Sequence, residues 1–180
     1  GCGSTASQLS KLGGDVVIEP LHHKHVLSVQ GPRSLDVIAT LAETDVSDLP
    51  YLSHRRLRLA GHPVVVSRTG FTGLRGYEVY CDGADAPPLW HALRQSGEPV
   101  GLLPYSYRCI DLLRIEAGFT LFPADFAPAA SIWEVGLGWL VAGKEASYTG
   151  RDAVERGRAE AKHRLIGVRF PGAPPFDEVG

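Results

Sequence analysis

Residues 64–81 read Val-Val-Val-Ser-Arg-Thr-Gly-Phe-Thr-Gly-Leu-Arg-Gly-Tyr-Glu-Val-Tyr-Cys. Three β-branched residues open this stretch and an alternating run, residues 77–81, closes it, so we expect a strand at each end. The loop between them, residues 68–76, holds three glycines in nine residues. Because glycine has no Cβ, such a loop lets the backbone approach a flat ligand closely. The stretch therefore predicts two strands joined by a loop suited to binding.

The elements around this stretch predict an α+β fold. The order strand, helix, hairpin, strand, helix is typical of an antiparallel sheet with helices on one face. The chain beyond residue 118 is rich in loops. The elements expected, in chain order, are the end of a strand and a short helix within 1–14, strands over 16–18 and 25–30, a helix over 32–42, a hairpin over 57–66 that turns at Gly61-His62-Pro63, a strand over 77–81, helices over 85–95 and 105–117, a short helix over 150–161, and a strand over 165–170.

Charge and hydropathy exclude two classes of partner. The chain carries 18 Lys+Arg and 20 Asp+Glu, so its formal net charge is 18 − 20 = −2, and the sequence has no run of basic residues. We therefore expect no nucleic-acid binding through bulk charge. No apolar stretch reaches the ~18–20 residues that span a bilayer, and the first residues lack the features of a secretory signal. These observations predict a cytoplasmic protein with no membrane partner.

Cysteine and histidine do not predict a metal centre. Cys2, Cys81 and Cys109 are widely spaced and include no CxxC pair, which argues against a disulfide framework or a zinc site and suits a reducing compartment. The histidines of residues 22–25 have no neighbouring cysteine or carboxylate to complete a ligand set. The chain opens on Gly1 and contains no methionine. We expect it to be a piece of a longer protein.

Five stretches, taken in order, resemble the aminomethyltransferase family, typified by the glycine-cleavage T-protein. The resemblance implies a ferredoxin-like folate-binding domain, incomplete at both ends. It also implies tetrahydrofolate-dependent transfer of a methyl or methylene group from a small-molecule methyl or aminomethyl donor. The expected domains are 1–118 (folate-binding, partial), 119–164 (a loop-rich segment completing the folate-binding region) and 165–180 (the start of a truncated C-terminal β-barrel). The five stretches are Leu27–Pro32, Ser67–Gly73 with Gly76–Tyr80, Leu113–Gly118, Glu134–Trp139 and Tyr148–Ala153.

Glu78 and Tyr80 are the leading candidates for a folate contact. On a strand they share one face, while Tyr77, Val79 and Cys81 point to the other. A carboxylate accepts two N–H donors, which matches the 2-amino pyrimidinone edge of a pterin, and an aromatic ring stacks on its plane. In the family that this chain resembles, the glutamate matching Glu78 contacts the pterin. The alternative is that Glu78 lies on a solvated strand face.

The helix expected over 105–117 departs from the glycine-cleavage pattern. Those members have an arginine directly before the aspartate matching Asp111, where this chain has Ile110. Arg108 lies two residues earlier, about 200° around a helix. This arrangement looks like the dimethylglycine-dehydrogenase-type and demethylase branches, and the resemblance implies that Arg108 contacts folate. The alternative is a surface ion pair between Arg108 and Asp111.

Four further side chains have either a binding role or a structural one. Arg68 is a candidate for the glutamate tail of folate, with a solvated loop charge as the alternative. Trp139 is a candidate wall of the folate site, with core packing as the alternative. We expect Arg114 and Glu116, which belong to the family signature, to serve helix capping and packing.

No catalytic residue is assigned. The resemblance places the catalytic aspartate upstream of the strand that ends near residues 2–5, so a second chain is a possible source of the missing part. The alternative function is a non-catalytic folate-binding or iron–sulfur-assembly module. That branch has a Lys-Gly-Cys preceding its tyrosine, and residues 146–152 lack it, which favours the transferase.

Overall fold

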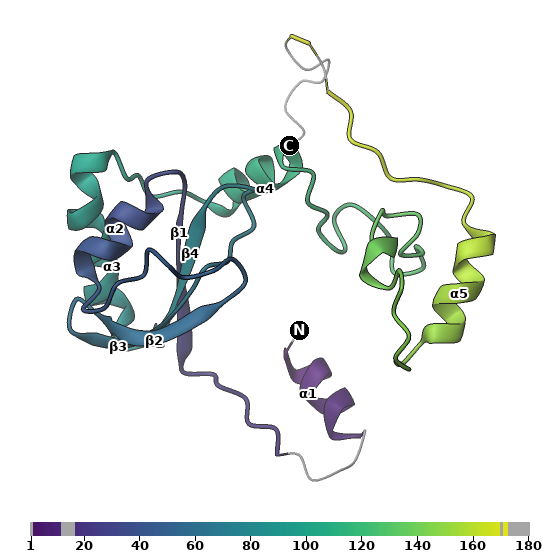
Figure 1. Ribbon diagram of the computed structural model, residues 1–180, viewed down its shortest axis with the longest axis horizontal. Helices are drawn as coiled ribbons and strands as arrows, with labels where there is room; N and C mark the ends of the chain where they lie inside the picture. The colour runs from purple at the N-terminus through teal and green to yellow at the C-terminus, as the bar shows by residue number, and fades with distance from the viewer. Residues whose placement is uncertain (1, 12–16, 170, 173–180) are drawn as a thin grey trace. The chain divides into compact units, whose positions relative to one another are not determined.

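The computed structural model describes residues 2–11, 17–169 and 171–172 (Figure 1). The chain divides into two compact units, Gly1–Ser106 and Tyr107–Gly180. The first unit contains α1 (Cys2–Ser10), β1 (Lys24–Gln30), α2 (Ser34–Leu41), β2 (His54–Leu59), β3 (His62–Ser67), β4 (Gly76–Asp82), α3 (Ala86–Gly97) and the 3₁₀ helix η1 (Glu98–Val100). The second contains α4 (Tyr107–Glu116), the 3₁₀ helix η2 (Gly138–Leu140) and α5 (Arg151–Glu160).

The first unit is a four-stranded antiparallel sheet in the order β1-β4-β3-β2. Helices α2 and α3 pack on each other, α2 against β4 and α3 against β1 (Figure 1). They cover one face of the sheet, and we call the opposite face the open face. The predicted α+β class, an antiparallel sheet with helices on one face, is confirmed.

The core lies between the sheet and the two helices. Alternation along each strand turns every second side chain toward α2 and α3, as a period of two requires. Burying each large apolar side chain stabilises the fold by about 1.5–3 kcal/mol relative to leaving it in water. The buried residues include Val29, Leu59, Val64, Val66, Tyr77, Val79 and Cys81 from the strands, Val37 and Ile38 from α2, and Leu89 and Leu93 from α3.

The predicted hairpin is present, but its turn lies one residue earlier than expected. Leu59 pairs with His62, so the loop is Ala60-Gly61. Both loop residues have positive φ, 48° and 81°. Positive φ at both positions is the signature of the type I′ turn, whose twist matches that of the flanking strands. The tight turn places His62 and Pro63 on β3.

Two predicted strands are not found. Val17, Ile18 and residues 165–169 carry no regular secondary structure; Val16 and Phe170 lie outside the described residues. Residues 2–10 form a helix, where the end of a strand was also expected. A strand needs a neighbouring ladder, and Leu165 forms one backbone hydrogen bond, from its N–H to Glu134 O (2.7 Å). Apolar pattern alone therefore misled the prediction. The domain divisions at residues 118 and 164 stay a prediction.

In the part of the chain that the structure describes, no helix combines the length and the apolar character needed to cross a bilayer.

Candidate functional site

Glu78 anchors a cluster of polar side chains on the open face of the sheet. Its Oε2 accepts a hydrogen bond from Thr69 Oγ1 and another from the Tyr80 hydroxyl (3.2 Å). Ser67, the register partner of Glu78 on β3, lies 3.0 Å from Thr69 through its Oγ. Glu78 is half-buried and Tyr80 is exposed, whereas Tyr77 is fully buried on the other face. The predicted division of the strand into two faces is confirmed.

The electrostatics of this cluster keep Tyr80 a hydrogen-bond donor. Burial raises the pKa of the Tyr80 phenol, and the neighbouring Glu78 charge and its hydrogen bond raise it further. A neutral phenol therefore donates to the carboxylate across the physiological pH range.

One oxygen of the Glu78 carboxylate remains available to a ligand. Both donors converge on Oε2, and among the described residues none donates a hydrogen bond to Oε1. An ionised carboxylate offers about four lone-pair sites. A ligand edge that carries N–H donors can therefore bind Glu78 while Thr69 and Tyr80 hold the carboxylate in place.

Gln30, at the end of β1, braces the glycine-rich loop beside this cluster. It joins β1 to both ends of the loop and so fixes where Thr69 lies. Its Nε2 lies within 3.1 Å of Ser28 Oγ, 3.3 Å of Thr69 O and 3.4 Å of Tyr77 O, and Thr72 Oγ1 donates to its Oε1 (3.3 Å).

Two glycines of the loop make room for this brace. A Cβ added at Gly70 or at Gly76 would lie closer than 3.0 Å to the Oε1, Cδ and Nε2 atoms of Gln30. Real Cβ atoms do not approach other heavy atoms so closely, so any larger residue at these positions displaces the amide. The sequence predicted that these glycines let a ligand approach the backbone closely. In the structure, they leave space for the side chain of Gln30.

Arg68 forms its hydrogen bonds with other residues of the protein. Its Nη1 donates to Leu49 O at 2.9 Å, and its backbone exchanges hydrogen bonds with Leu52 (3.2 Å) and Ser53 (2.9 Å). The side chain thereby ties the start of the glycine-rich loop to the segment before β2. Its predicted contact with the glutamate tail of folate stays a prediction.

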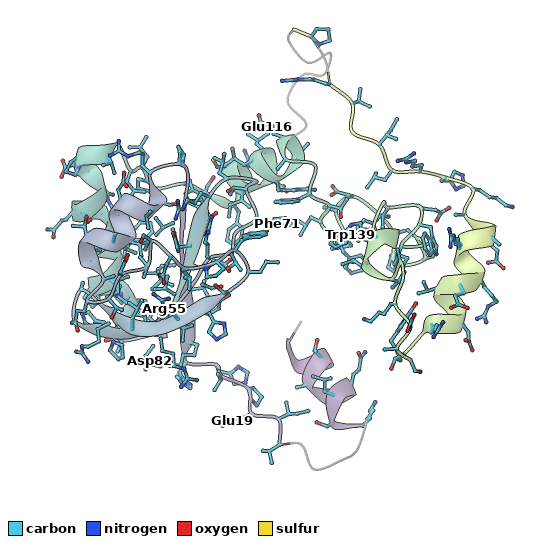
Figure 2. The ribbon with its side chains drawn as sticks, viewed as in Figure 1. Glu19, Arg55, Phe71, Asp82, Glu116 and Trp139 are labelled. Atoms are coloured by element: carbon cyan, nitrogen blue, oxygen red, sulfur yellow. The ribbon has the colours of Figure 1, made fainter. Side chains whose placement is uncertain are left out.

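Arg108 and Trp139, the other two predicted site residues, belong to the second unit. Arg108 is exposed on α4, and its side chain forms no hydrogen bond or ion pair with any described residue. The alternative pair with Asp111 does not form, because Asp111 bonds Arg114 at 2.9 Å. Trp139 is 70% exposed (Figure 2), so core packing does not account for it. Both remain predicted folate contacts.

Arg114 holds the end of α4, as the sequence predicted for a structural residue. Its side chain is 3% exposed. The guanidinium bonds Asp111, the carbonyl of Phe119 (3.3 Å) and the carboxylate of Asp125. Burial opposes ionisation of Asp125, yet hydrogen bonds from Arg114 and the Leu121 N–H hold its pKa below the usual value. The cation therefore fixes the loop after α4.

Glu134 joins two segments of the second unit. Its carboxylate accepts the N–H groups of Ser131 (3.1 Å), Lys162 (3.3 Å) and His163 (3.2 Å). These backbone hydrogen bonds, that of Ser131 first, lower the pKa of Glu134. The glutamate that opens the stretch 134–139 is therefore structural.

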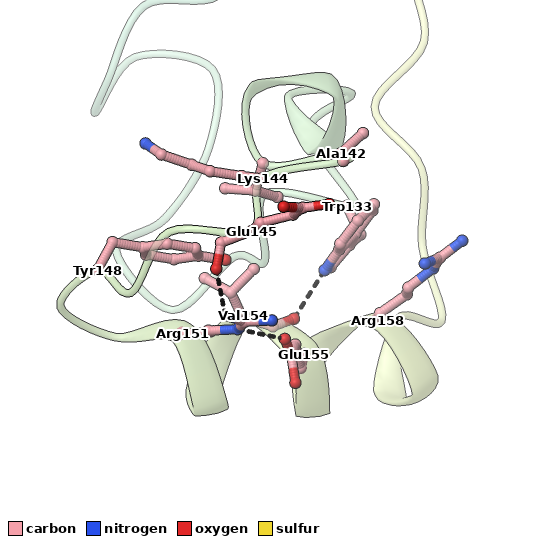
Figure 3. A pocket seen from close by; sticks show the side chains of 11 residues that line it. Trp133, Ala142, Lys144, Glu145, Tyr148, Arg151, Val154, Glu155 and Arg158 are labelled. Carbon is pink, nitrogen blue, oxygen red and sulfur yellow. Dashed lines mark hydrogen bonds and ion pairs between the residues drawn. The ribbon is translucent and has the colours of Figure 1, made fainter.

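A pocket of about 480 Å³ lies beside the start of α5 (Figure 3). Trp133 lines it and donates from Nε1 to Val154 O at 2.8 Å, with Arg158 stacked 4.9 Å from its ring centre. Trp139 is not among its lining residues. In the second unit the packed tryptophan is therefore Trp133.

The described residues include no group of three or more metal-ligating side chains.

Comparison with known proteins decides the family. The sequence model of the GCVT N-terminal domain matches residues 4–145. The chain belongs to this family. A heme-dependent oxidative N-demethylase gamma subunit from Ectopseudomonas mendocina is 35% identical over 157 residues, 82% of this chain and 42% of that protein. An aminomethyltransferase from Streptomyces avermitilis is 36% identical over 166 residues, 89% of this chain and 45% of that protein.

This GCVT-family chain spans less than half the length of these curated relatives. The crystal structure of glycine cleavage system aminomethyltransferase T from Bartonella henselae shares its fold, with a TM-score of 0.73 and 20% identity over 88% of this chain and 43% of that chain. The predicted resemblance to the aminomethyltransferase family is confirmed.

Two residues of the candidate site, Thr69 and Gln30, were not predicted from the sequence. Thr69 lies in the glycine-rich loop, two residues after Ser67, and its contact with Glu78 depends on the fold of that loop. Gln30 ends the strand predicted over 25–30, and the sequence pattern gives its side chain no role. A polar residue at a strand end, facing two glycines across the sheet, is the signal that points to a brace, but it becomes visible only once the register is known.

Proposed function

We propose that this chain is the folate-binding part of an enzyme that transfers a methyl or methylene group from a small-molecule donor to tetrahydrofolate. Membership of the GCVT family supports folate as the cofactor. The observation that carries the proposal is the Glu78 carboxylate, which Thr69 and Tyr80 hold on the open face of the sheet with Oε1 available. The alternative of an iron–sulfur-assembly module has no support from the relatives above, which are named as a transferase and a demethylase.

The residues present fit a pterin. Glu78 accepts the N–H donors of the 2-amino pyrimidinone edge, which orients the ring, and Tyr80 lies beside it as a wall. Bound tetrahydrofolate supplies N5, the nitrogen that receives the one-carbon unit. The chain contributes mainly by positioning, because holding both reactants in place replaces a bimolecular encounter.

The remaining assignments extend this proposal. Arg108, Arg68 and Trp139 are proposed to contact folate. The curated relatives are more than twice as long as the matched region, so further segments or a second chain are proposed to supply the catalytic carboxylate and the donor site. Free Cys81 and Cys109 support the proposed cytoplasmic location.

Calorimetric titration of tetrahydrofolate into the full chain tests the proposal. Glu78→Gln keeps the shape of the side chain but presents an amide N–H₂ to the donors of the pterin. We expect affinity to fall tenfold or more, about 1.4 kcal/mol per tenfold. Glu98→Gln, an exposed carboxylate on η1, is the matched control and should bind as the parent does. Unchanged affinity in Glu78→Gln, or no binding by the folded parent, contradicts the proposal.

A further inference from the structure

Side chains on the open face of the sheet form parallel rows across the strands. Strand register places partners side by side, and every second residue of a strand shares the face. The first row contains the polar residues Ser28, Glu78, Ser67 and His54, and the second contains Val26, Tyr80, Val65 and Arg56. An apolar row that ends in a cation thus lies next to the polar row of Glu78.

The second row is not covered by the rest of the first unit. Val26 is 48% exposed and Tyr80 is 39% exposed. Together with Val65 and Pro63 they line a broad groove of about 910 Å³. Apolar surface gathered in this way, with polar residues at its rim, is typical of a binding groove. Tyr80 connects the groove to the candidate site, because it lines the groove and donates to Glu78.

Arg56 carries a charge that no described residue neutralises. It is exposed on β2 and lines the groove. The other basic side chains nearby are paired: Lys24 with Asp82 at 2.6 Å, Arg55 with Asp48 at 3.0 Å, and Arg58 with Glu43 at 3.5 Å. An anionic group that enters the groove therefore finds one unpaired guanidinium, at the end of the apolar row.

We propose that this groove binds the p-aminobenzoyl-glutamate tail of the folate whose pterin contacts Glu78, a proposal that rests on the function proposed above. The aromatic segment lies on Tyr80 and Val65, and a glutamate carboxylate binds Arg56. Glu78 and Arg56 are two strands and one row apart, which puts their backbones about 12 Å from each other. The groove offers an apolar surface and then a cation, in the order in which the tail presents an aromatic ring and then carboxylates.

The charge argument favours this occupant. A guanidinium binds a carboxylate through paired N–H donors, which gives the contact direction as well as charge. A ligand without the tail, such as 6-methyltetrahydropterin, keeps the pterin contacts with Glu78 and makes none with Arg56. Comparison of the two ligands therefore isolates the contacts of the tail, and Arg56→Gln isolates the groove's share of them.

The test is calorimetric titration of tetrahydrofolate and of 6-methyltetrahydropterin into the full chain and two variants. Arg56→Gln should weaken tetrahydrofolate binding about threefold to tenfold and leave tetrahydropterin binding unchanged. Arg58→Gln, on the same strand and face but paired with Glu43, is the matched control and should change neither. Raising the ionic strength should reduce the parent's preference for tetrahydrofolate and leave that of Arg56→Gln nearly constant, because salt screens exposed charge pairs.

Two outcomes overturn the tail assignment. Equal losses for both ligands in Arg56→Gln would mean that the arginine acts on the pterin site or on the fold. No loss for either ligand would mean that another part of the protein covers this face. Glu78→Gln separates these results from failure of the proposed function. If that function holds, Glu78→Gln lowers the affinity for both ligands, whatever the result for Arg56→Gln. If that function fails, Glu78→Gln changes the affinity for neither ligand.

Discussion

Gly76→Ala should destabilise the protein through a side chain on another strand. The φ of Gly76 lies outside the positive range that glycine alone adopts readily, so alanine fits the backbone. Its Cβ does not fit beside Gln30, whose amide atoms would lie closer than 3.0 Å. The substitution must therefore displace the Gln30 side chain from the loop that it braces.

The size of the effect follows from the contacts of Gln30. Nε2 has two protons for three acceptors at 3.1 to 3.4 Å, and Oε1 accepts one further hydrogen bond at 3.3 Å. About three bonds at ~0.5–1 kcal/mol each give ~2 kcal/mol. Gln30→Ala loses the same bonds, so we also expect ~2 kcal/mol. In the double variant the clash is gone, and the total should stay near ~2 rather than ~4 kcal/mol.

Urea denaturation of the parent, the two single variants and the double variant measures this coupling. Gly167→Ala serves as the control, because a Cβ there meets no atom within 4 Å, and it should unfold as the parent does. Additive losses in the double variant would refute the reasoning, since they would show that Gly76 and Gln30 act on stability independently.

Two further variants test the charges described above. Arg114→Ala should lower the melting temperature by several degrees, because it leaves Asp125 without its buried cation. Arg108→Ala is the control and should leave the melting temperature unchanged. Similar shifts of the two variants in circular dichroism melts would contradict the structural role of Arg114. Tyr80 has a raised pKa, so its contribution to stability is complete below the unfolded pKa of about 10 and is lost as pH rises through the folded value. Urea midpoints should therefore fall more steeply above about pH 10 in the parent than in Tyr80→Phe, and parallel curves would argue against the hydrogen bond to Glu78.

Local patterns predicted most of the first unit. The alternation in residues 77–81 identified a strand with one buried face, because burial of Tyr77 and Val79 is a property of every second residue. The expected helix over 85–95 corresponds to α3, where prolines suit the first turn. The prediction of a strand over 165–170 was wrong, because a strand depends on a neighbouring strand and a local pattern does not specify one.

The site was predictable only in part, for the same reason. The direction of Glu78 follows from the period of a strand, and its neighbour Tyr80 follows with it. The contact of Glu78 with Thr69 depends on how the glycine-rich loop returns to the sheet. The contact of Arg114 with Asp125 joins residues eleven positions apart and depends on the path of the loop after α4. Such contacts are set by tertiary structure, so sequence spacing does not reveal them.

The position of β2 at the end of the strand order has a consequence for association between molecules. An edge strand exposes unpaired backbone groups and is a template for adding strands from another chain. Residues 42 and 43 pair with Leu59 and Arg58 at one end of β2. The other four residues of the strand, 54–57, include a histidine and two arginines. Two such edges brought together would set their Arg56 cations, which no described residue neutralises, against each other, and this repulsion opposes sheet extension and aggregation.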